Sequence, residues 1–310
     1  METLKDFVFE RVIGEDQRLK SVAVLGRFEG KDGQAVVLLS RRHFAADSLR
    51  EILSLKTSIS EIFSNDVYSK YEGQLPPQHA AINVDLIYPA TAKHISKHST
   101  QNYFMLQESP RDYMTITRPF IQAIDKKRIQ WVYNILDKSK EVDRLLFEDP
   151  DTKNGFMLHP DLKWDQQQAE SLYCIAICHS REVQSMRDIT PTNISMLKNI
   201  RDKSCAEIAK RYGVPASKLR VFIHYQPSYY HFHVHFCHVN LEGMGAVAGR
   251  AHLLSDVIDN VENIAEDYYS RRTLTMVLGE NDPLVGAFIE AKGMDWLQEG
   301  HSMCHTMPVM

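Results

Sequence analysis

Three histidines alternate with apolar residues in the second half of the chain, where residues 231–235 read His-Phe-His-Val-His. Because side chains alternate between the two faces of a β-strand, an extended conformation would place all three imidazoles on one face. Such a face can transfer phosphoryl or nucleotidyl groups through a nucleophilic imidazole, or it can bind a metal ion. The surrounding residues must decide between these two chemistries.

The spacing of these histidines favours the nucleophile over the metal. Histidines at i, i+2 and i+4 of a strand are separated by about 7 Å per step, whereas zinc ligands lie about 2.0–2.2 Å from one ion. Two side chains can converge on an ion, but three would be strained. A solvated strand face is the plainest alternative, yet five of the 14 histidines fall between residues 224 and 238, which argues against it. The spacing therefore argues against a metal bound by all three histidines, and we expect a site that holds neither a metal nor a cofactor.

The flanking residues predict the elements that hold these histidines in place. Residues 219–225 predict one strand, Gln-Pro-Ser at 226–228 predicts a turn, and residues 229–239 predict the histidine strand. Two neighbouring strands would bring His224 close to the face that carries the other histidines. The site would then be assembled from one hairpin.

Helices and strands alternate elsewhere in the chain. A capping-box pattern at Asp165 and Gln168 predicts a helix through about residue 178. Thr-Pro at 190 begins another helix, which runs to Gly213. Short β-rich runs between turn signals predict a mostly antiparallel first domain. The strands predicted in that domain cover residues 21–25, 35–39 and 84–88.

We expect four segments along the chain. Residues 1–90 would form a small α+β domain, 91–115 a helical connector, 116–300 a second α+β domain with the histidines, and 301–310 a frayed tail. The glycines between residues 243 and 249 match no nucleotide-binding fingerprint, so a plain connector loop is expected there.

The composition narrows the class of protein. A chain of 310 residues with 44% hydrophobic content can bury a sizeable core. Its 36 basic and 40 acidic side chains give a net charge of −4, which argues against binding long nucleic acid through many phosphate contacts. The five cysteines form no Cys-x-x-Cys pair, and no apolar run has secretory or membrane-spanning length. We predict a cytoplasmic protein, with a nuclear fraction left open.

Longer segments carry a family resemblance. Residues 224–236 resemble the histidine-triad pattern of nucleotide hydrolases and transferases. The additional His224 and the Pro-Ser-Tyr-Tyr sequence at 227–230 resemble the scavenger messenger-RNA decapping family, a branch of that superfamily. Three further segments are similar to the same family, and they extend the likeness over most of the chain: residues 63–68, 129–134 and 155–168.

The resemblance implies a hydrolase of the triphosphate bridge in 7-methylguanosine caps. His233 would attack the phosphate nearest the methylated guanosine and form a transient phosphoramide. His231 and His235 would orient it and bind phosphate oxygens, and His224 would assist from the neighbouring strand. A neutral imidazole is nucleophilic near its ordinary pKa of about 6.5, and a protonated neighbour would stabilise the leaving diphosphate. The product would be 7-methylguanosine monophosphate.

Two other functions stay open at this point. A metal-dependent nucleotide hydrolase could use the same histidine strand, and it would lose activity to chelators. A non-catalytic cap-binding module would bind capped fragments without releasing a nucleotide monophosphate. The intact His233 argues against the second of these.

Recognition of 7-methylguanine is a separate chemical problem. The methylated base is cationic and has lost its N7 acceptor, so its complement is an aromatic face together with a carboxylate. The resemblance implies that Trp131 supplies the face and Glu141 the carboxylate, while Pro160, Asp161 and Lys163 close over the nucleotide and Lys163 holds phosphate. Without the resemblance, Trp131 would be interpreted as a core residue of a strand and the others as solvated turns or loops.

The resemblance also implies contacts beyond the base. Ser228 and Tyr229 would bind substrate from the turn before the histidines. Asn65 and Tyr68 would come from a first-domain segment that reaches over the active site of a domain-swapped homodimer, and Lys97 would contact phosphate. Asn-Asp at 65–66 would otherwise be interpreted as a turn. The expected partners are capped dinucleotides, short capped RNA fragments left by 3′-to-5′ decay and a second copy of the chain, but no membrane or long nucleic acid.

Overall fold

The chain is a mixed α+β protein whose paired strands are all antiparallel. It divides into two compact units, residues 1–101 and 102–310. The predicted α+β class is confirmed. The computed structural model describes residues 4–17, 20–42, 44, 46–54, 57–161, 164, 166, 168–243 and 245–299.

The first unit is built on a four-stranded sheet in the order β1-β2-β3-β6. Its small core contains Ile13, Ala23, Leu25 and Val36, which the alternation of the strands turns to one side. The three strands predicted in this region are confirmed. The strands are β1 (Phe7–Asp16), β2 (Ser21–Phe28), β3 (Gln34–Arg41) and β6 (Ile82–Ala90).

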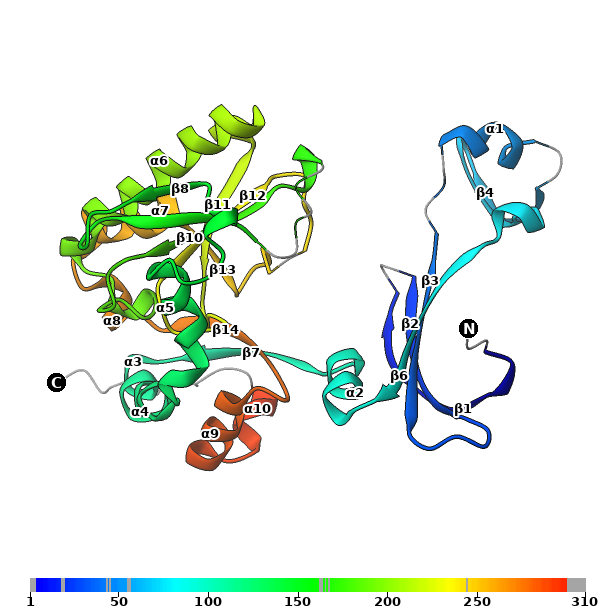
Figure 1. Ribbon diagram of the computed structural model, residues 1–310, viewed down its shortest axis with the longest axis horizontal. Coiled ribbons are helices and arrows are strands. Elements are labelled where there is room, and N and C mark those ends of the chain that lie inside the picture. Colours follow the sequence, from blue (N-terminus) through cyan, green and yellow to red (C-terminus); the bar gives the residue numbers. More distant parts are fainter. Residues whose placement is uncertain are drawn as a thin grey trace. The chain divides into compact units, whose positions relative to one another are not determined.

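A separate hairpin, β4 (Ser58–Asn65) and β5 (Tyr68–Gln74), pairs only with itself among the described strands (Figure 1). Every residue of both strands is exposed. Short helical elements complete this unit: residues Leu4–Asp6, Ala46–Ser48, α1 (Leu49–Ile52), Pro77–His79 and α2 (Ala92–His98).

The second unit is centred on a six-stranded sheet in the order β13-β11-β12-β10-β9-β8. Helix α6 (Ile194–Tyr212) packs on one face, where Leu197 and Ile200 join Val234 and Phe236 in the main core (Figure 1). Helix α5 (Gln130–Leu136) covers part of the other face. The strands are β8 (Phe147–Asp149), β9 (Phe156–Pro160), β10 (Tyr173–Cys178), β11 (Leu219–His224), β12 (His233–His238) and β13 (Ala251–Leu253).

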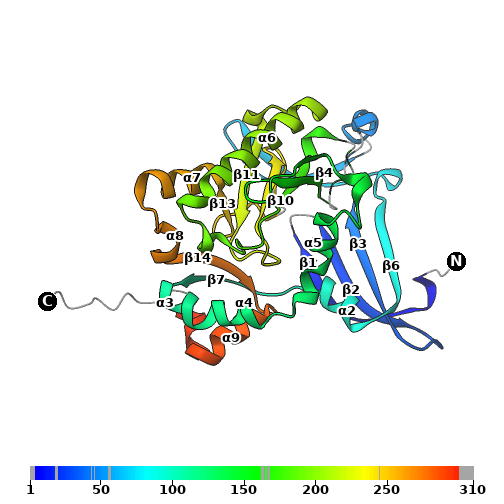
Figure 2. The same ribbon diagram turned by 60° about the vertical axis from the view of Figure 1, so that its left-hand side comes forward.

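A two-stranded sheet, β7 (Tyr103–Glu108) with β14 (Leu274–Gly279), lies beside this layer, and α4 and α9 lie beneath it in Figure 2. The remaining helices of this unit are α3 (Pro110–Asp112), a π-helical turn (Tyr113–Thr117), α4 (Arg118–Ala123), α7 (Leu254–Asp259), a second π turn (Asn260–Ile264), α8 (Tyr268–Arg271), α9 (Pro283–Lys292) and α10 (Asp295–Glu299). Its 3-10 turns are Lys126–Ile129, Val142–Arg144, Ala169–Ser171, Met186–Asp188, Pro191–Asn193 and Ala216–Lys218. No helix in the described residues is both long and apolar enough to span a membrane.

Three predicted elements are wrong. The helix expected through residue 178 is strand β10, since a short apolar run buried on both faces has no strand periodicity. The expected strand around Trp131 is helix α5. The expected helical connector ends at His98, and residues 103–108 form strand β7. By contrast, the helix ending at Gly213 is confirmed, with that glycine in the left-handed conformation at its C-cap.

Candidate active site

A cavity of about 370 Å³ lies on the face of the six-stranded sheet that α5 partly covers. All of its lining residues belong to the second unit. The cavity brings together residues that the sequence scatters over more than a hundred positions. Nine of the predicted site residues line it: Trp131, Glu141, Pro160, Asp161, His224, Ser228, Tyr229, His233 and His235.

His233 is held in one orientation and one protonation state. Its Nδ1–H donates to the backbone carbonyl of His231 at 2.7 Å, which leaves Nε2 with the lone pair of the neutral ring. The Tyr229 ring stacks on the imidazole, with ring centroids 4.2 Å apart. Burial lowers the pKa of His233 to about 4, so the ring is neutral at physiological pH. A buried, neutral and oriented imidazole is the form that attacks phosphorus.

Two more histidines adjoin this one. The His235 ring lies 4.9 Å from that of His233 and 4.3 Å from that of His224, centroid to centroid. The Tyr173 hydroxyl and His235 Nδ1 are 3.0 Å apart and form a hydrogen bond. The hairpin of β11 and β12 therefore gathers three imidazoles, as the sequence predicts.

His231 does not project from the histidine strand, which begins at His233 rather than at residue 229. Its Nε2–H donates to the backbone carbonyl of Cys178 at 2.8 Å, and its ring contacts Tyr133 rather than lining the cavity. Burial lowers the pKa of this ring as well. His231 orients His233 through its backbone carbonyl, so the expectation of three imidazoles on one strand face is wrong for this residue.

Trp131 and Glu141 meet in the same cavity. Trp131 is 45% exposed, which excludes the core interpretation, and its ring packs edge-on against Tyr229 with centroids 4.9 Å apart. The Arg144 Nη1 donates to the Glu141 carboxylate at 2.9 Å, and the Arg144 Nη2 donates to the carbonyl of Pro160 at 3.1 Å. An aromatic surface and a positioned carboxylate thus lie beside the histidines, as binding of a cationic base requires.

Comparison with known proteins agrees with this geometry. Residues 2–101 match the family described as "Scavenger mRNA decapping enzyme (DcpS) N-terminal", and residues 130–249 match "Scavenger mRNA decapping enzyme C-term binding". The chain belongs to the scavenger mRNA decapping enzyme family.

Curated members of this family resemble the chain over most of its length, and each is named m7GpppX diphosphatase. The protein of Bos taurus is 43% identical over 291 residues, which are 92% of this chain and 86% of that protein. The protein of Homo sapiens is 41% identical over 291 residues, with the same coverage. The protein of Schizosaccharomyces pombe is 36% identical over 286 residues, covering 90% of this chain and 93% of that protein.

Besides His231, four residues predicted from the family resemblance are not placed in the cavity. Lys163 lies outside the described residues. Asn65 and Tyr68 face each other across the tip of the β4–β5 hairpin, where Asp66 has the left-handed conformation, so the turn interpretation also holds. Lys97 is exposed on α2. These last three belong to the first unit, and their roles stay predictions.

The glycine-rich loop proves to be more than a connector, because Gly245 and Arg250 line the cavity. A Cβ atom at Gly245 would lie 2.6 Å from the His224 Nε2, so the close approach requires glycine. The Tyr225 N–H donates to the carbonyl of Arg250 at 2.8 Å, which ties this arginine to the end of β11. No sequence motif marks Gly245 or Arg250 as a site residue. Only the pairing of β13 with β11 brings their loop to the histidines.

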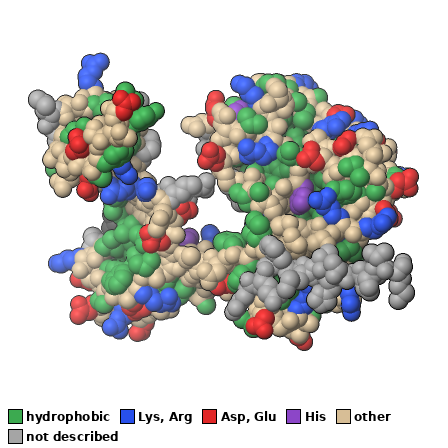
Figure 3. All heavy atoms as spheres, turned by 180° about the vertical axis from the view of Figure 1, so that it is seen from behind, with side chains coloured by type: hydrophobic (Ala, Val, Ile, Leu, Met, Phe, Trp, Pro, Cys, Tyr) green, Lys and Arg blue, Asp and Glu red, His purple; other side chains and the backbone are tan. Residues whose placement is uncertain are grey.

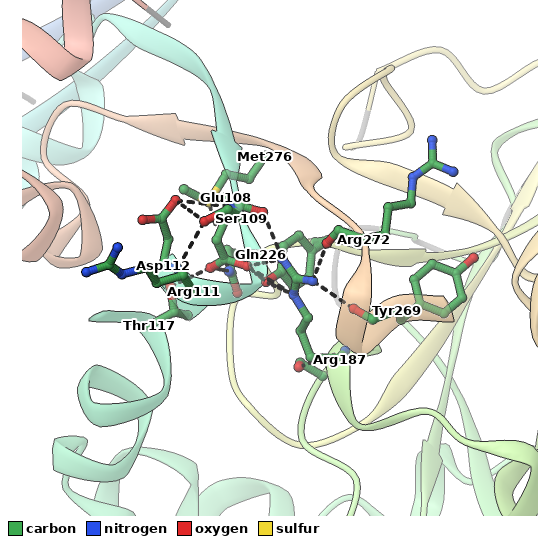
Figure 4. Close-up of polar contacts among 12 residues, drawn as sticks. Glu108, Ser109, Arg111, Asp112, Thr117, Arg187, Gln226, Tyr269, Arg272 and Met276 are labelled. Atoms are coloured by element: carbon green, nitrogen blue, oxygen red, sulfur yellow. Dashed lines mark hydrogen bonds and ion pairs between the residues drawn. The ribbon is translucent and has the colours of Figure 1, made fainter. Parts of the chain in front are cut away.

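A buried ion pair supports the turn before the histidines (Figure 4). Arg187 Nη2 and Glu108 Oε2 are 2.7 Å apart, and both side chains are fully buried. Glu108 Oε1 accepts from Gln226 Nε2 at 3.3 Å, and Gln226 Oε1 accepts from the Tyr230 hydroxyl at 3.2 Å. The network therefore fixes the two ends of the segment that carries Ser228 and Tyr229. Sequence reasoning missed it because the two charges are 79 residues apart.

Within the described part of the chain, no three His, Cys, Asp or Glu side chains are arranged to bind one metal ion. The cavity instead combines the neutral His233 imidazole, three further imidazoles, two arginines and an aromatic–carboxylate pair. That set fits a cationic base joined to a string of phosphates.

Proposed function

We propose that this protein hydrolyses the triphosphate bridge of 7-methylguanosine cap dinucleotides and of short capped oligonucleotides left by 3′-to-5′ decay. The observation that carries the proposal is the position of His233, which shares one cavity with Trp131 and Glu141. The nucleophile and the base-binding pair thus lie within reach of one small ligand. The curated relatives named m7GpppX diphosphatase support the same substrate.

In the proposed first step, His233 Nε2 attacks the phosphate nearest the methylated guanosine. A P–N bond forms, and the bond from that phosphorus to the bridging oxygen breaks. The remaining nucleoside diphosphate takes both electrons of the broken bond, while His235, His224 and Arg250 stabilise the charge on the phosphate oxygens. The His231 carbonyl, which accepts from Nδ1–H, stabilises the positive charge of the attacking ring.

In the second step, water attacks the same phosphorus and releases a proton to solvent, and the P–N bond breaks. The electron pair returns to His233 Nε2, and 7-methylguanosine monophosphate is released with the oxygen from water. We propose that neither step needs a metal, because hydrogen bonds from His224 and His235 and the positive charge of Arg250 stabilise the phosphate oxygens in its place.

Product analysis tests this function. The protein is incubated with a capped dinucleotide and excess chelator, and the products are separated by chromatography. We expect 7-methylguanosine monophosphate and a nucleoside diphosphate in equal amounts. Release of 7-methylguanosine diphosphate, or an activity that disappears with a tightly bound metal, would contradict the proposal.

We further propose a histidine-triad fold for the second unit and a domain-swapped homodimer in which the first unit closes over the site. The exposed apolar surface of the first unit supports an assembly, and Figure 3 shows hydrophobic side chains gathered on it.

A closing lid would exclude long RNA, so capped dinucleotides should react much faster than capped transcripts of hundreds of nucleotides. Equal single-turnover rates on the two substrates would contradict the lid.

We propose the cytoplasm as the compartment of this protein, with the nucleus as a second one, and cell fractionation tests this.

A further inference from the structure

A further histidine lies on the face of the sheet that carries His233 and His235. His159 of β9 is paired with Ile175 of β10, which is in turn paired with His235 of β12. Residues paired across an antiparallel sheet point to the same face. His159 is therefore two strands away from His235, about 10 Å, on the same wall of the cavity.

This imidazole is buried without a hydrogen bond. Its exposed fraction is 4%, and neither ring nitrogen has a partner among the described residues. Buried polar side chains in native proteins nearly always have one, so an imidazole that lines a cavity unpaired is positioned for a ligand. Burial also lowers the pKa of His159, so the ring is neutral and offers one N–H donor and one acceptor.

His159 lies near the base-binding end of the cavity. The charges that act on it are those of Glu141 and Arg144, the ion pair beside Trp131. A carboxylate only accepts hydrogen bonds, so Glu141 can serve the N1–H and the exocyclic amine of a guanine but not its O6 oxygen. Arg144 is already engaged with Glu141 and with the Pro160 carbonyl. Two buried donors that line the cavity lack a partner among the described residues at this end, the His159 ring and the Tyr229 hydroxyl. The charge that acts most strongly on Tyr229 is that of Asp161 rather than Glu141, so His159 is the donor beside the Glu141 carboxylate.

We propose that His159 is a specificity-determining residue whose N–H donates to the O6 oxygen of the methylated guanine, beside the contacts of Glu141. The inference rests on the proposed cap substrate and names the group that binds O6, next to the N1–H and the exocyclic amine that Glu141 accepts from on the same edge of the base. It makes His159 a binding residue without a role at phosphorus. Its loss should therefore raise KM and leave kcat nearly unchanged.

Binding of 7-methylguanosine monophosphate, measured by calorimetry, tests the proposal. His159→Leu should weaken binding about 10-fold, the effect of one lost hydrogen bond with its partner left unpaired. His159→Gln keeps an N–H donor and should recover most of that loss. His252→Leu is the matched control, because His252 is a partly buried histidine outside the cavity whose pKa is also lowered by burial, and it should bind like the wild type.

The 6-thio analogue of the same nucleotide provides a second measurement that needs no variant. Sulfur accepts hydrogen bonds weakly, so the wild type should prefer the oxo form, and His159→Leu should erase that preference. Equal wild-type affinity for the two forms, or His159→Leu binding as tightly as the wild type, overturns the role of His159. Failure of the wild type to bind 7-methylguanosine monophosphate at all would instead overturn the proposed function.

Discussion

The two units of this chain bury their apolar residues to very different extents. In the second unit, helices cover the central strands on both faces, and β12 is buried along its whole length. In the first unit, the hairpin β4–β5 is exposed throughout, and 15 of the 25 exposed large hydrophobic side chains described lie in its roughly one hundred residues. The second unit completes its own core around the histidines. The first leaves apolar surface of the kind that binding partners cover.

If the chemistry resides in the self-contained unit, one substitution there should abolish it. His233→Asn should lower kcat at least about 10³-fold, because no P–N bond can form, while binding of 7-methylguanosine monophosphate persists. Single-turnover kinetics and calorimetry measure the two effects. The matched variant His231→Asn should cost far less, since His231 acts through its backbone carbonyl. Near-normal turnover of His233→Asn would remove this residue from the mechanism.

The stability of the second unit should depend on its buried ion pair. Arg187→Met leaves the Glu108 carboxylate buried without its cation, which typically costs about 3–5 kcal/mol of unfolding free energy. Arg201→Met, which removes an exposed pair with Asp202, is the control and should cost under about 1 kcal/mol. Urea unfolding compares the two variants. Equal losses of unfolding free energy in the two variants would show that burial of the Arg187–Glu108 pair does not affect its contribution to stability.

The burial of His233 should make the stability of the protein depend on pH. The pKa of His233 is about 4 in the folded protein and about 6.5 in an unfolded chain. Between pH 6.5 and 4, the unfolded state therefore binds a proton at this residue and the folded state does not. Stability should fall as the pH decreases from 6.5 to 4, by up to about 3 kcal/mol from this group, and level off below. His233→Asn should lack this component in urea titrations at pH 7, 5.5 and 4. If the wild type and His233→Asn lose the same unfolding free energy between pH 7 and 4, His233 is not the group responsible.

The sequence predicts the two units unequally. Residue types and spacing identify the histidine hairpin, the strands of the first sheet and the helix ending at Gly213, because alternation and capping are local signals. They do not reveal Arg250 or His159, which reach the site through strand pairing, or Glu108, which supports it through an ion pair with a residue 79 positions away. The sequence of strand β10 favours a helix, because burial on both faces leaves no apolar–polar alternation. Local patterns thus point to His233 as the candidate nucleophile, and only the fold identifies the residues that surround it.

The exposed hairpin provides the converse test on the first unit. Phe63 is 49% exposed, and burying such a ring on association is worth about 1.5–3 kcal/mol. Phe63→Asp should therefore weaken a homodimer about 10- to 100-fold, as measured by analytical ultracentrifugation. Ile264→Asp alters a similarly exposed apolar residue of the second unit and should leave association unchanged. A wild-type chain that stays monomeric at all concentrations would contradict the idea that a second copy covers this surface.

The smallest expected effect concerns Trp131, which is exposed although it belongs to the second unit, where most apolar residues are buried. Its indole attracts a cationic base by about 0.5–2 kcal/mol, depending on desolvation, and gains little from an unmethylated one. Trp131→Ala should narrow the ratio of kcat/KM for methylated over unmethylated cap dinucleotides by about 2- to 30-fold. Trp131→Phe keeps an aromatic face and should retain part of the preference. Tyr229 packs against both Trp131 and His233, so any effect of the alanine variant on His233 slows both substrates alike and leaves the ratio unchanged. An unchanged ratio in both Trp131→Ala and Glu141→Gln would place recognition of the methyl group elsewhere in the cavity.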